Sequence, residues 1–294
     1  MSLQFSPVIT PIRRGNGSTA SVEMFDLREM REWASPVTNV FHSRQRGRGF
    51  EPHPHAGFSA ITYVFEDSQT GMRTRDSLGG DIAMGPGGIV WSQAGSGMIH
   101  EETAVDPDRE LHGLQVFVNL RSQDKLAAPK VFDLAASRVP VWQSATGDRV
   151  RVVVGSFQGL SSPLVPAESV DWLDVELRRE IAFDLTDDRN AVVYVVTGQV
   201  LVRGEGREQE VEGGQSVAVH GSDGGARLTC QAVQSAHLLI FSGAPIREPV
   251  VFDGQFMMNE PSQIEAAAAR YRAGEMGHLT PLSDTYHERP GAVA

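Results

Sequence analysis

The sequence predicts an all-β protein folded as a sandwich or barrel, and three observations support this class. Short runs rich in β-branched and aromatic residues recur at 59–65, 113–120, 150–154, 191–196, 200–202 and 238–241. Gly-Gly and Gly-Pro-Gly turn signals separate these runs, and 30 of the 294 residues are glycine, above the usual share of about 7%. The third observation is an internal echo between the two halves of the chain.

This echo predicts two copies of one β-unit. Residues 61–66 resemble residues 192–197, and their central tyrosines, Tyr63 and Tyr194, lie 131 residues apart (194 − 63). A repeat of this period divides the chain naturally into two domains. We expect an N-terminal unit at 1–130, a second unit at 131–250 and a C-terminal segment at 251–294.

Two helices are expected to interrupt the β pattern. One is short and early, at 24–33. The other lies near the end of the chain, where Ser262 and Glu265 have the spacing of a capping box and an alanine-rich stretch follows. Gly274 then supplies the residue at which this second helix should stop.

Composition excludes several classes of protein. The 26 Lys and Arg against 37 Asp and Glu give a net charge of −11, which argues against direct nucleic-acid binding. The single cysteine, Cys230, excludes an internal disulfide and a cysteine-based zinc site. No apolar run approaches a membrane span, and the first residues lack the layout of a signal peptide. A cytoplasmic protein without membrane partners is therefore expected.

The histidines carry the most specific functional signal. His53 and His55 are two residues apart, so both imidazoles project from the same side of an extended chain. Pro54 between them offers no N–H to a neighbouring strand, which predicts an edge or an opening. His100 and Glu102 repeat the same spacing 45 residues later. Glu101 between them should point to the opposite side and be exposed.

Three imidazoles and one carboxylate form a mixed nitrogen and oxygen ligand set. Such a set suits Fe, Mn, Co, Ni, Cu or Zn and is unlike the oxygen-rich sites of Ca or Mg. The alternative is structural, because a histidine in a β protein is usually hydrogen-bonded, and two at this spacing can be exposed neighbours. The residues alone leave both interpretations open.

These residues nevertheless carry a family resemblance. The segment His53-Pro54-His55-x-Gly57-Phe58, followed by 86–102 with its Ile-His-x-Glu ending, is similar to the pirin family of the cupin superfamily. Residues 247–259 and the helix after them also resemble pirins. The resemblance implies a bicupin, with two β-barrels in tandem and a C-terminal segment whose short helix packs back on the first barrel.

The resemblance also implies a ligand set and a cofactor. Pirins hold one metal ion, usually iron, in the N-terminal barrel, and the matching residues are His53, His55, His100 and Glu102. One divalent ion is therefore expected, with Fe(II) first and Mn, Ni, Co, Cu or Zn as alternatives. The second barrel is expected to hold no metal.

Two positions depart from the family pattern. Ala56 stands where pirins usually carry arginine, and Ser59 stands where they carry glutamate. The substitutions predict a more open and less cationic entrance at Ala56 and the loss of a charge at Ser59 that could orient a ligand. The preferred substrate, and whether dioxygenase activity survives these two changes, stay open.

Aromatic and sulfur-containing side chains near the ligands are candidates for a substrate cavity. Phe58, Trp91 and Met98 are predicted to contact substrate, with Phe50 as a further wall residue. For each of these residues the alternative is ordinary packing in the barrel core.

The resemblance suggests two functions from different classes. Some bacterial pirins resemble quercetin 2,3-dioxygenases, so the first is a metal-dependent dioxygenase acting with dioxygen on a flavonol or another chelating aromatic substrate. In that interpretation Glu102 accepts the phenolic proton. The second is a non-enzymatic, iron-dependent regulatory protein that acts through a protein partner.

Overall fold

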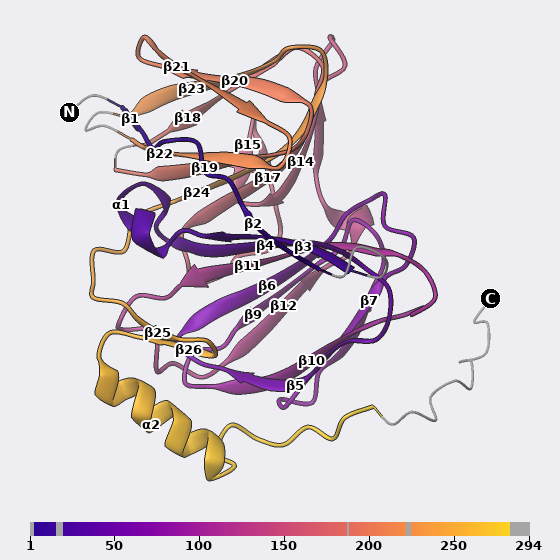
Figure 1. Ribbon diagram of the computed structural model, residues 1–294, viewed down its shortest axis with the longest axis vertical. Helices are drawn as coiled ribbons and strands as arrows, with labels where there is room; N and C mark the ends of the chain where they lie inside the picture. Colours follow the sequence, from indigo (N-terminus) through magenta and orange to yellow (C-terminus); the bar gives the residue numbers. More distant parts are fainter. Residues whose placement is uncertain (1–2, 16–19, 187, 222–224, 283–294) are drawn as a thin grey trace.

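The computed structural model describes residues 3–15, 20–186, 188–221 and 225–282, and it is built almost entirely of antiparallel strands. Figure 1 shows two β-barrels, the first coloured indigo to magenta and the second magenta to orange. Each barrel is made from a seven-stranded and a four-stranded sheet. The prediction of an all-β fold with two barrels in tandem is confirmed.

The first barrel contains the strands that carry the histidines. Its seven-stranded sheet has the order β12 (Lys130–Leu134), β9 (Ile89–Gln93), β6 (Phe58–Val64), β11 (Leu111–Asn119), β4 (Val37–Gln45), β3 (Ala20–Asp26) and β2 (Ile12–Gly15). Its four-stranded sheet has the order β5 (Gly49–His55), β10 (Met98–Ala104), β7 (Met72–Asp76) and β8 (Asp81–Met84).

The second barrel repeats this strand order. Its seven-stranded sheet runs β1 (Gln4–Phe5), β22 (Gln215–His220), β19 (Asn190–Thr197), β24 (Ala236–Gly243), β17 (Val170–Leu177), β14 (Arg149–Val154) and β13 (Val141–Gln143). Its four-stranded sheet runs β18 (Glu180–Leu185), β23 (Ala226–Ala232), β20 (Gln199–Gly204) and β21 (Arg207–Glu212). The tyrosines of the sequence echo lie on corresponding central strands, β6 and β19.

Short elements complete the fold. They are the hairpins β15 (Ser156–Phe157) with β16 (Leu160–Ser161) and β25 (Val251–Asp253) with β26 (Phe256–Met258), the 3-10 turns Arg28–Met30 and Ala136–Arg138, and the helices α1 (Arg31–Ala34) and α2 (Pro261–Arg272). No described helix is long and apolar enough to cross a membrane.

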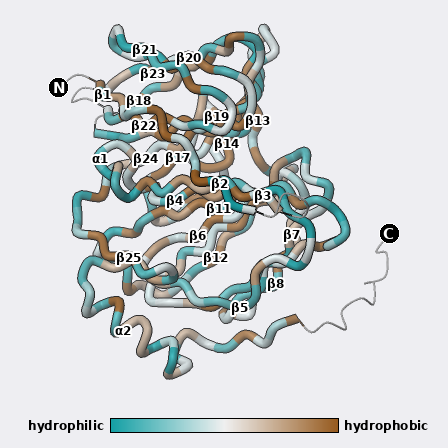
Figure 2. The backbone as a smooth tube through the Cα atoms, in the orientation of Figure 1, coloured by the Kyte–Doolittle hydropathy of each residue, from teal (hydrophilic) through white to brown (hydrophobic). Residues whose placement is uncertain are grey.

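The structure confirms the later of the two expected helices and only part of the earlier one. The early one is confirmed only in its second half, because residues 24–26 belong to β3, whereas Arg28–Met30 forms a 3-10 turn that continues into the α-helix Arg31–Ala34. The late one is confirmed, but its capping box is Glu260 with Gln263, two residues before the predicted pair. Gly274 has φ +77° directly after the helix, as a C-terminal stop requires. Figure 2 shows mixed hydrophilic and hydrophobic residues along α2, and Ile264 is on its buried face.

Strand pairing does not follow the expected boundaries in every place. β1 pairs with β22 of the second barrel, although the first unit was expected to begin at residue 1. β12 pairs with β9 and so extends the first barrel beyond residue 130. We propose that the division between the barrels lies between β12 and β13.

The main apolar core lies between the two seven-stranded sheets. It combines side chains from both barrels, including Ile61 and Leu114 from the first and Trp172 and Phe241 from the second. A second core fills the interior of the second barrel, where Phe183 and other apolar residues point inward.

Buried polar groups link the barrels within the first of these cores. Asp174 accepts hydrogen bonds from His237 at 2.6 Å and from the hydroxyl of Tyr63, which comes from the other barrel. Arg151 lies 3.5 Å from the same carboxylate and donates to the Gly87 carbonyl at 2.6 Å. The two barrels therefore share a buried network in addition to their apolar contact.

A second hydrogen-bonded network lies at the equivalent strand positions, with the roles of the two barrels exchanged. Tyr194 is hydrogen-bonded to Nδ1 of His42 at 2.5 Å, and Nε2 of His42 is 2.6 Å from Nε2 of His112. Burial lowers the pKa of His42 to about 3, so this imidazole is neutral at pH 7. The sequence echo thus extends to how the barrels contact each other.

Candidate metal centre

The ligand strands are neighbours at the edge of the four-stranded sheet. β5 is the edge strand, which accommodates Pro54, and β10 is its partner. His53 lies opposite His100 in the register, and Met98 lies opposite His55. The two sequence segments, 45 residues apart, are therefore brought together by strand pairing.

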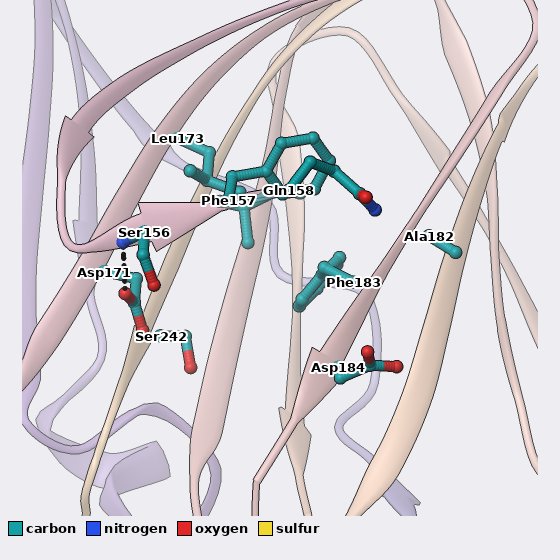
Figure 3. Close-up of a pocket in the computed structure, with 10 residues that line it drawn as sticks. Ser156, Phe157, Gln158, Asp171, Leu173, Ala182, Phe183, Asp184 and Ser242 are labelled. Carbon is teal, nitrogen blue, oxygen red and sulfur yellow. Dashed lines mark hydrogen bonds between the residues drawn. The ribbon is translucent and has the colours of Figure 1, made fainter. Parts of the chain in front are cut away.

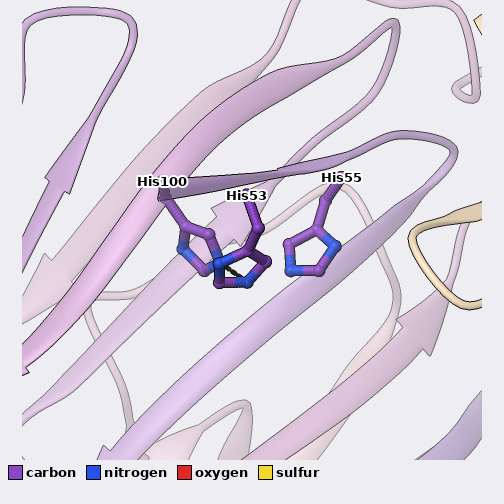
Figure 4. Close-up of side chains that lie close together, drawn as sticks. All are labelled: His53, His55 and His100. Carbon is purple, nitrogen blue, oxygen red and sulfur yellow. Dashed lines mark hydrogen bonds between the residues drawn. The ribbon is translucent and has the colours of Figure 1, made fainter. Parts of the chain in front are cut away.

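Three histidines form one compact group inside the first barrel. One ring nitrogen from each of His53, His55 and His100 lies within 4.8 Å of the others. The Nε2 atoms of His53 and His100 are 3.1 Å apart, and Figure 4 shows the three rings turned toward one another. This arrangement can hold one metal ion.

Burial keeps these imidazoles neutral. It lowers the pKa of His55 to about 3 and that of His100 well below its usual range, and neighbouring histidines add to both effects. Burial also lowers the pKa of His53, partly opposed by a 2.7 Å hydrogen bond between Nδ1 and the Glu51 carbonyl. A neutral imidazole is the form that binds metal.

Ring nitrogens without hydrogen-bond partners also indicate that these histidines can bind a metal. Both ring nitrogens of His55 and Nδ1 of His100 are buried without a hydrogen-bond partner among the described residues. Buried polar atoms are nearly always satisfied, and exceptions point to an ion or another missing partner. At His53, the bond to Glu51 occupies Nδ1 and leaves Nε2 free to bind.

Glu102 is not part of this three-histidine group. Its carboxylate accepts hydrogen bonds from Thr62 Oγ1 and, at 3.1 Å, from Gln115 Nε2 across the barrel. The register shift beside Glu102 adds a residue to β5 and leaves β10 in unbroken pairing with β7, so Glu102 stays on the same face as His100. Burial raises the pKa of Glu102 to about 7, opposed by the Thr62 hydrogen bond.

The predicted substrate contacts lie in two different places. The Phe58 ring is 5.0 Å from the His55 ring, and Met98 precedes His100 by two residues on the same strand. Trp91 is not beside the histidines, because it packs with Ile61 in the core between the barrels. Phe50 is exposed, and its ring lies 6.3 Å from that of His53.

The two departures from the family pattern also lie away from a solvent opening. Ala56 is fully buried against Phe256 and Met258 of the C-terminal hairpin, so the expected open entrance at this residue is wrong. Ser59 points toward the second barrel, where its hydroxyl donates to the Glu168 carboxylate. Neither side chain is placed to orient a ligand of the three histidines.

Glu101 is buried, contrary to the expectation from strand alternation. It does point away from the barrel interior, but its carboxylate accepts a 2.6 Å hydrogen bond from Arg75 and a 3.4 Å one from the Leu282 amide. The C-terminal segment after α2 therefore covers the outer face of β10. The residues around Glu101 in the sequence do not indicate that a segment from the far end of the chain covers it.

Glu168 offers a prediction on pH. Burial raises its pKa to about 7, against the Ser59 hydrogen bond. A raised carboxyl pKa means that the folded protein binds the proton more tightly, so this group's contribution declines as pH rises from about 4.5 to about 7. Between pH 5 and pH 8, the free energy of unfolding of the wild-type protein should fall by roughly 2 kcal/mol more than that of Glu168→Gln, as measured by urea unfolding.

The control for this measurement is Glu265→Gln, because Glu265 is an exposed carboxyl on α2. It should leave the pH dependence as in the wild-type protein. A Glu168→Gln variant with an unchanged pH profile contradicts the assignment of a buried, neutral carboxyl to this position.

The structure also has a cavity outside the first barrel. It has a volume of about 180 Å³ in the second barrel and is lined by Phe157, Asp171 and Phe183 among others (Figure 3). Asp171 is already bonded there, to the Ser156 amide at 3.1 Å and to Arg189 at 2.6 Å. This cavity offers no histidine among its lining residues, unlike the first barrel.

Comparison with known protein families covers both barrels. The Pirin family matches residues 11–118, and the Pirin C-terminal cupin domain matches residues 172–277. A Vibrio cholerae protein named "Putative quercetin 2,3-dioxygenase" is 33% identical over 234 residues, which are 77% of this chain and 79% of that protein.

Solved structures show the same fold. A quercetin 2,3-dioxygenase from Acinetobacter baumannii superposes with a TM-score of 0.84 at 21% identity, over 95% of this chain and all of that one. The Escherichia coli pirin YhhW, solved in complex with nickel(II), gives a TM-score of 0.62 at 16% identity, over 83% of this chain and all of that one.

Proposed function

Because the chain belongs to the pirin family, we propose that it is a metal-dependent dioxygenase of the quercetin 2,3-dioxygenase type. The substrate class is a flavonol or another aromatic molecule with adjacent hydroxyl and keto oxygens. One observation carries the proposal, which is the convergence of three neutral histidines, buried His55 and His100 and partly buried His53, on one point in the first barrel.

The ligands in this proposal are His53, His55 and His100, with Glu102 as the fourth. Fe(II) is the expected ion, and the same nitrogen and oxygen donors also accept Mn, Ni, Co, Cu or Zn. When bound, a divalent ion supplies a Lewis acid that polarises the chelating oxygens of the substrate and favours its deprotonated form.

Glu102 is proposed to hold the phenolic proton. A buried carboxylate on the strand that carries His100 can accept and return a proton. Thr62 and Gln115 hold its two oxygens, so the carboxylate is oriented before substrate arrives. A role for Thr62 and Gln115 was not predicted from the sequence. The two residues lie opposite each other on the paired strands β6 and β11.

Phe58 and Met98 are proposed to line the space next to the ligands and to keep water away from the reacting substrate. Exposed Phe50, at the side of His53, is placed to contact an aromatic ring entering from solvent. Trp91 has no part in this proposal, because its side chain belongs to the core between the barrels.

The test is oxygen uptake by the Fe(II)-loaded protein with quercetin, followed together with the loss of flavonol absorbance. We expect both signals in the wild-type protein and neither above background in His53→Ala. Intact metal binding without oxygen uptake contradicts the dioxygenase proposal. That result favours the alternative, an iron-dependent regulatory protein that acts through a protein partner.

A further inference from the structure

Lys125 is a buried cation outside the three-histidine group. Its side chain is 1% exposed, and its ammonium donates three hydrogen bonds, all to uncharged oxygens. The acceptors are Asn119 Oδ1 at 2.6 Å, the Gly57 carbonyl at 2.7 Å and the Met257 carbonyl at 2.9 Å. Lysine is seldom buried in this way, so a specific role is expected.

The three acceptors come from segments far apart in the chain. Gly57 follows the ligand His55 by two residues, Asn119 ends β11, and Met257 lies in β26. A single ammonium therefore ties the turn after the ligand strand to the first barrel and to the C-terminal hairpin. Each of its three N–H groups has one acceptor, so the hydrogen-bonding capacity of the ammonium is fully used.

Backbone contacts place this junction directly beside His55. The Ala56 amide donates to the Gln255 carbonyl at 3.2 Å, and the Met257 amide donates to the Ala56 carbonyl at 2.9 Å. Gly57 has φ +81°, and a Cβ atom at that position would be 2.0 Å from the Met257 carbonyl oxygen. The C-terminal hairpin and the ligand turn are thus in close backbone contact.

We infer that Lys125 is a positioning residue of the metal centre, which holds the backbone after His55 against the C-terminal hairpin. The inference rests on the proposed function, because it presupposes that His55 binds a metal. Ligand side chains must be held to within about 0.5 Å for a site to bind tightly. The hydrogen bonds of Lys125 fix the turn from which the His55 side chain is presented.

Cobalt(II) affinity, measured by competition with a chelator, distinguishes this role from simple stabilisation. We expect Lys125→Met to bind Co(II) about 10- to 100-fold more weakly than the wild-type protein, as is typical for partners that orient metal ligands. The visible spectrum of bound Co(II) should change as well, because the position of one nitrogen ligand changes.

The matched control is Val193→Ala, a cavity-forming change in the core of the second barrel. It lowers stability but should leave the Co(II) affinity and spectrum as in the wild-type protein. Asn119→Leu, which keeps Lys125 but removes one acceptor, should give a smaller loss of affinity. This variant supplies the test if Lys125→Met does not fold.

The outcomes separate the two proposals. Wild-type protein that binds no Co(II) overturns the metal centre and this inference together. Wild-type binding with equal affinity and an equal spectrum in the folded Lys125 or Asn119 variant overturns the inference alone. An equal loss of affinity in Val193→Ala also overturns it, because stability then explains the effect.

Discussion

The His100→Ala variant is expected to lose metal binding, with affinity at least about 100-fold below that of the wild-type protein. His100 supplies the only histidine of β10 and lies opposite His53 in the strand pairing. It is 1% exposed, so water cannot readily replace the missing imidazole. Two histidines on one strand and Glu102 then remain, which is a weaker ligand set. Metal content after dialysis, measured by elemental analysis, checks this result.

The control for this variant is His278→Ala. His278 is exposed and lies after α2, apart from the three-histidine group. It should retain one metal ion for each chain. Stoichiometric metal in purified His100→Ala contradicts the proposed ligand set.

The Asp174→Ala variant is expected to lose about 3–5 kcal/mol of unfolding free energy at pH 7. The substitution removes the buried one of two carboxylates that lie 3.5 Å from the guanidinium of Arg151, leaving only the more exposed Glu66, and it removes acceptors from Tyr63 and His237. Because Tyr63 belongs to the first barrel, the loss also loosens the contact between the two barrels. Urea unfolding followed by circular dichroism measures the effect.

This effect should depend on pH in a definite direction. Burial opposes ionisation of Asp174, but hydrogen bonds from His237 and Tyr63 and the charge of Arg151 hold its pKa below the usual 3.8. A lowered pKa gives stability that is present above pH 3.8 and is lost as the pH falls through the folded value. The difference between the wild-type protein and Asp174→Ala should therefore shrink in strong acid.

Asp184→Ala is the matched control, since Asp184 is an exposed aspartate in the same barrel that pairs with Arg227 at 3.1 Å. A solvent-exposed pair of this kind contributes at most about 1 kcal/mol. Equal losses in the two variants would show that the buried network between the barrels does not stabilise the fold.

Local sequence patterns predicted the strands and the shared face of His53 and His55, whereas the ligand set with His100 was implied by the family resemblance. The i, i+2 spacing of His53 and His55 survives in an extended strand, and Pro54 correctly indicated an edge position. These features depend on neighbouring residues and on backbone geometry, which a sequence records directly. The pairing of β5 with β10 joins segments far apart in the chain, so local patterns do not specify it.

Long-range packing explains the predictions that failed. Trp91 was predicted to line the substrate cavity, but its side chain lies in the core shared with the second barrel. The sequence does not show this contact between the barrels. Glu101 looked exposed because the sequence does not show that the chain around Leu282 covers it. Lys125 gave no signal at all, since its three acceptors are far apart in sequence.

One measurement tests the metal centre most directly, namely an anomalous difference map from a crystal of Ni(II)-loaded protein. The account predicts one strong peak in the first barrel, bonded to Nε2 of His53 and to one ring nitrogen each of His55 and His100. A loaded crystal with no peak among these histidines, or with its main peak elsewhere in the chain, would contradict it.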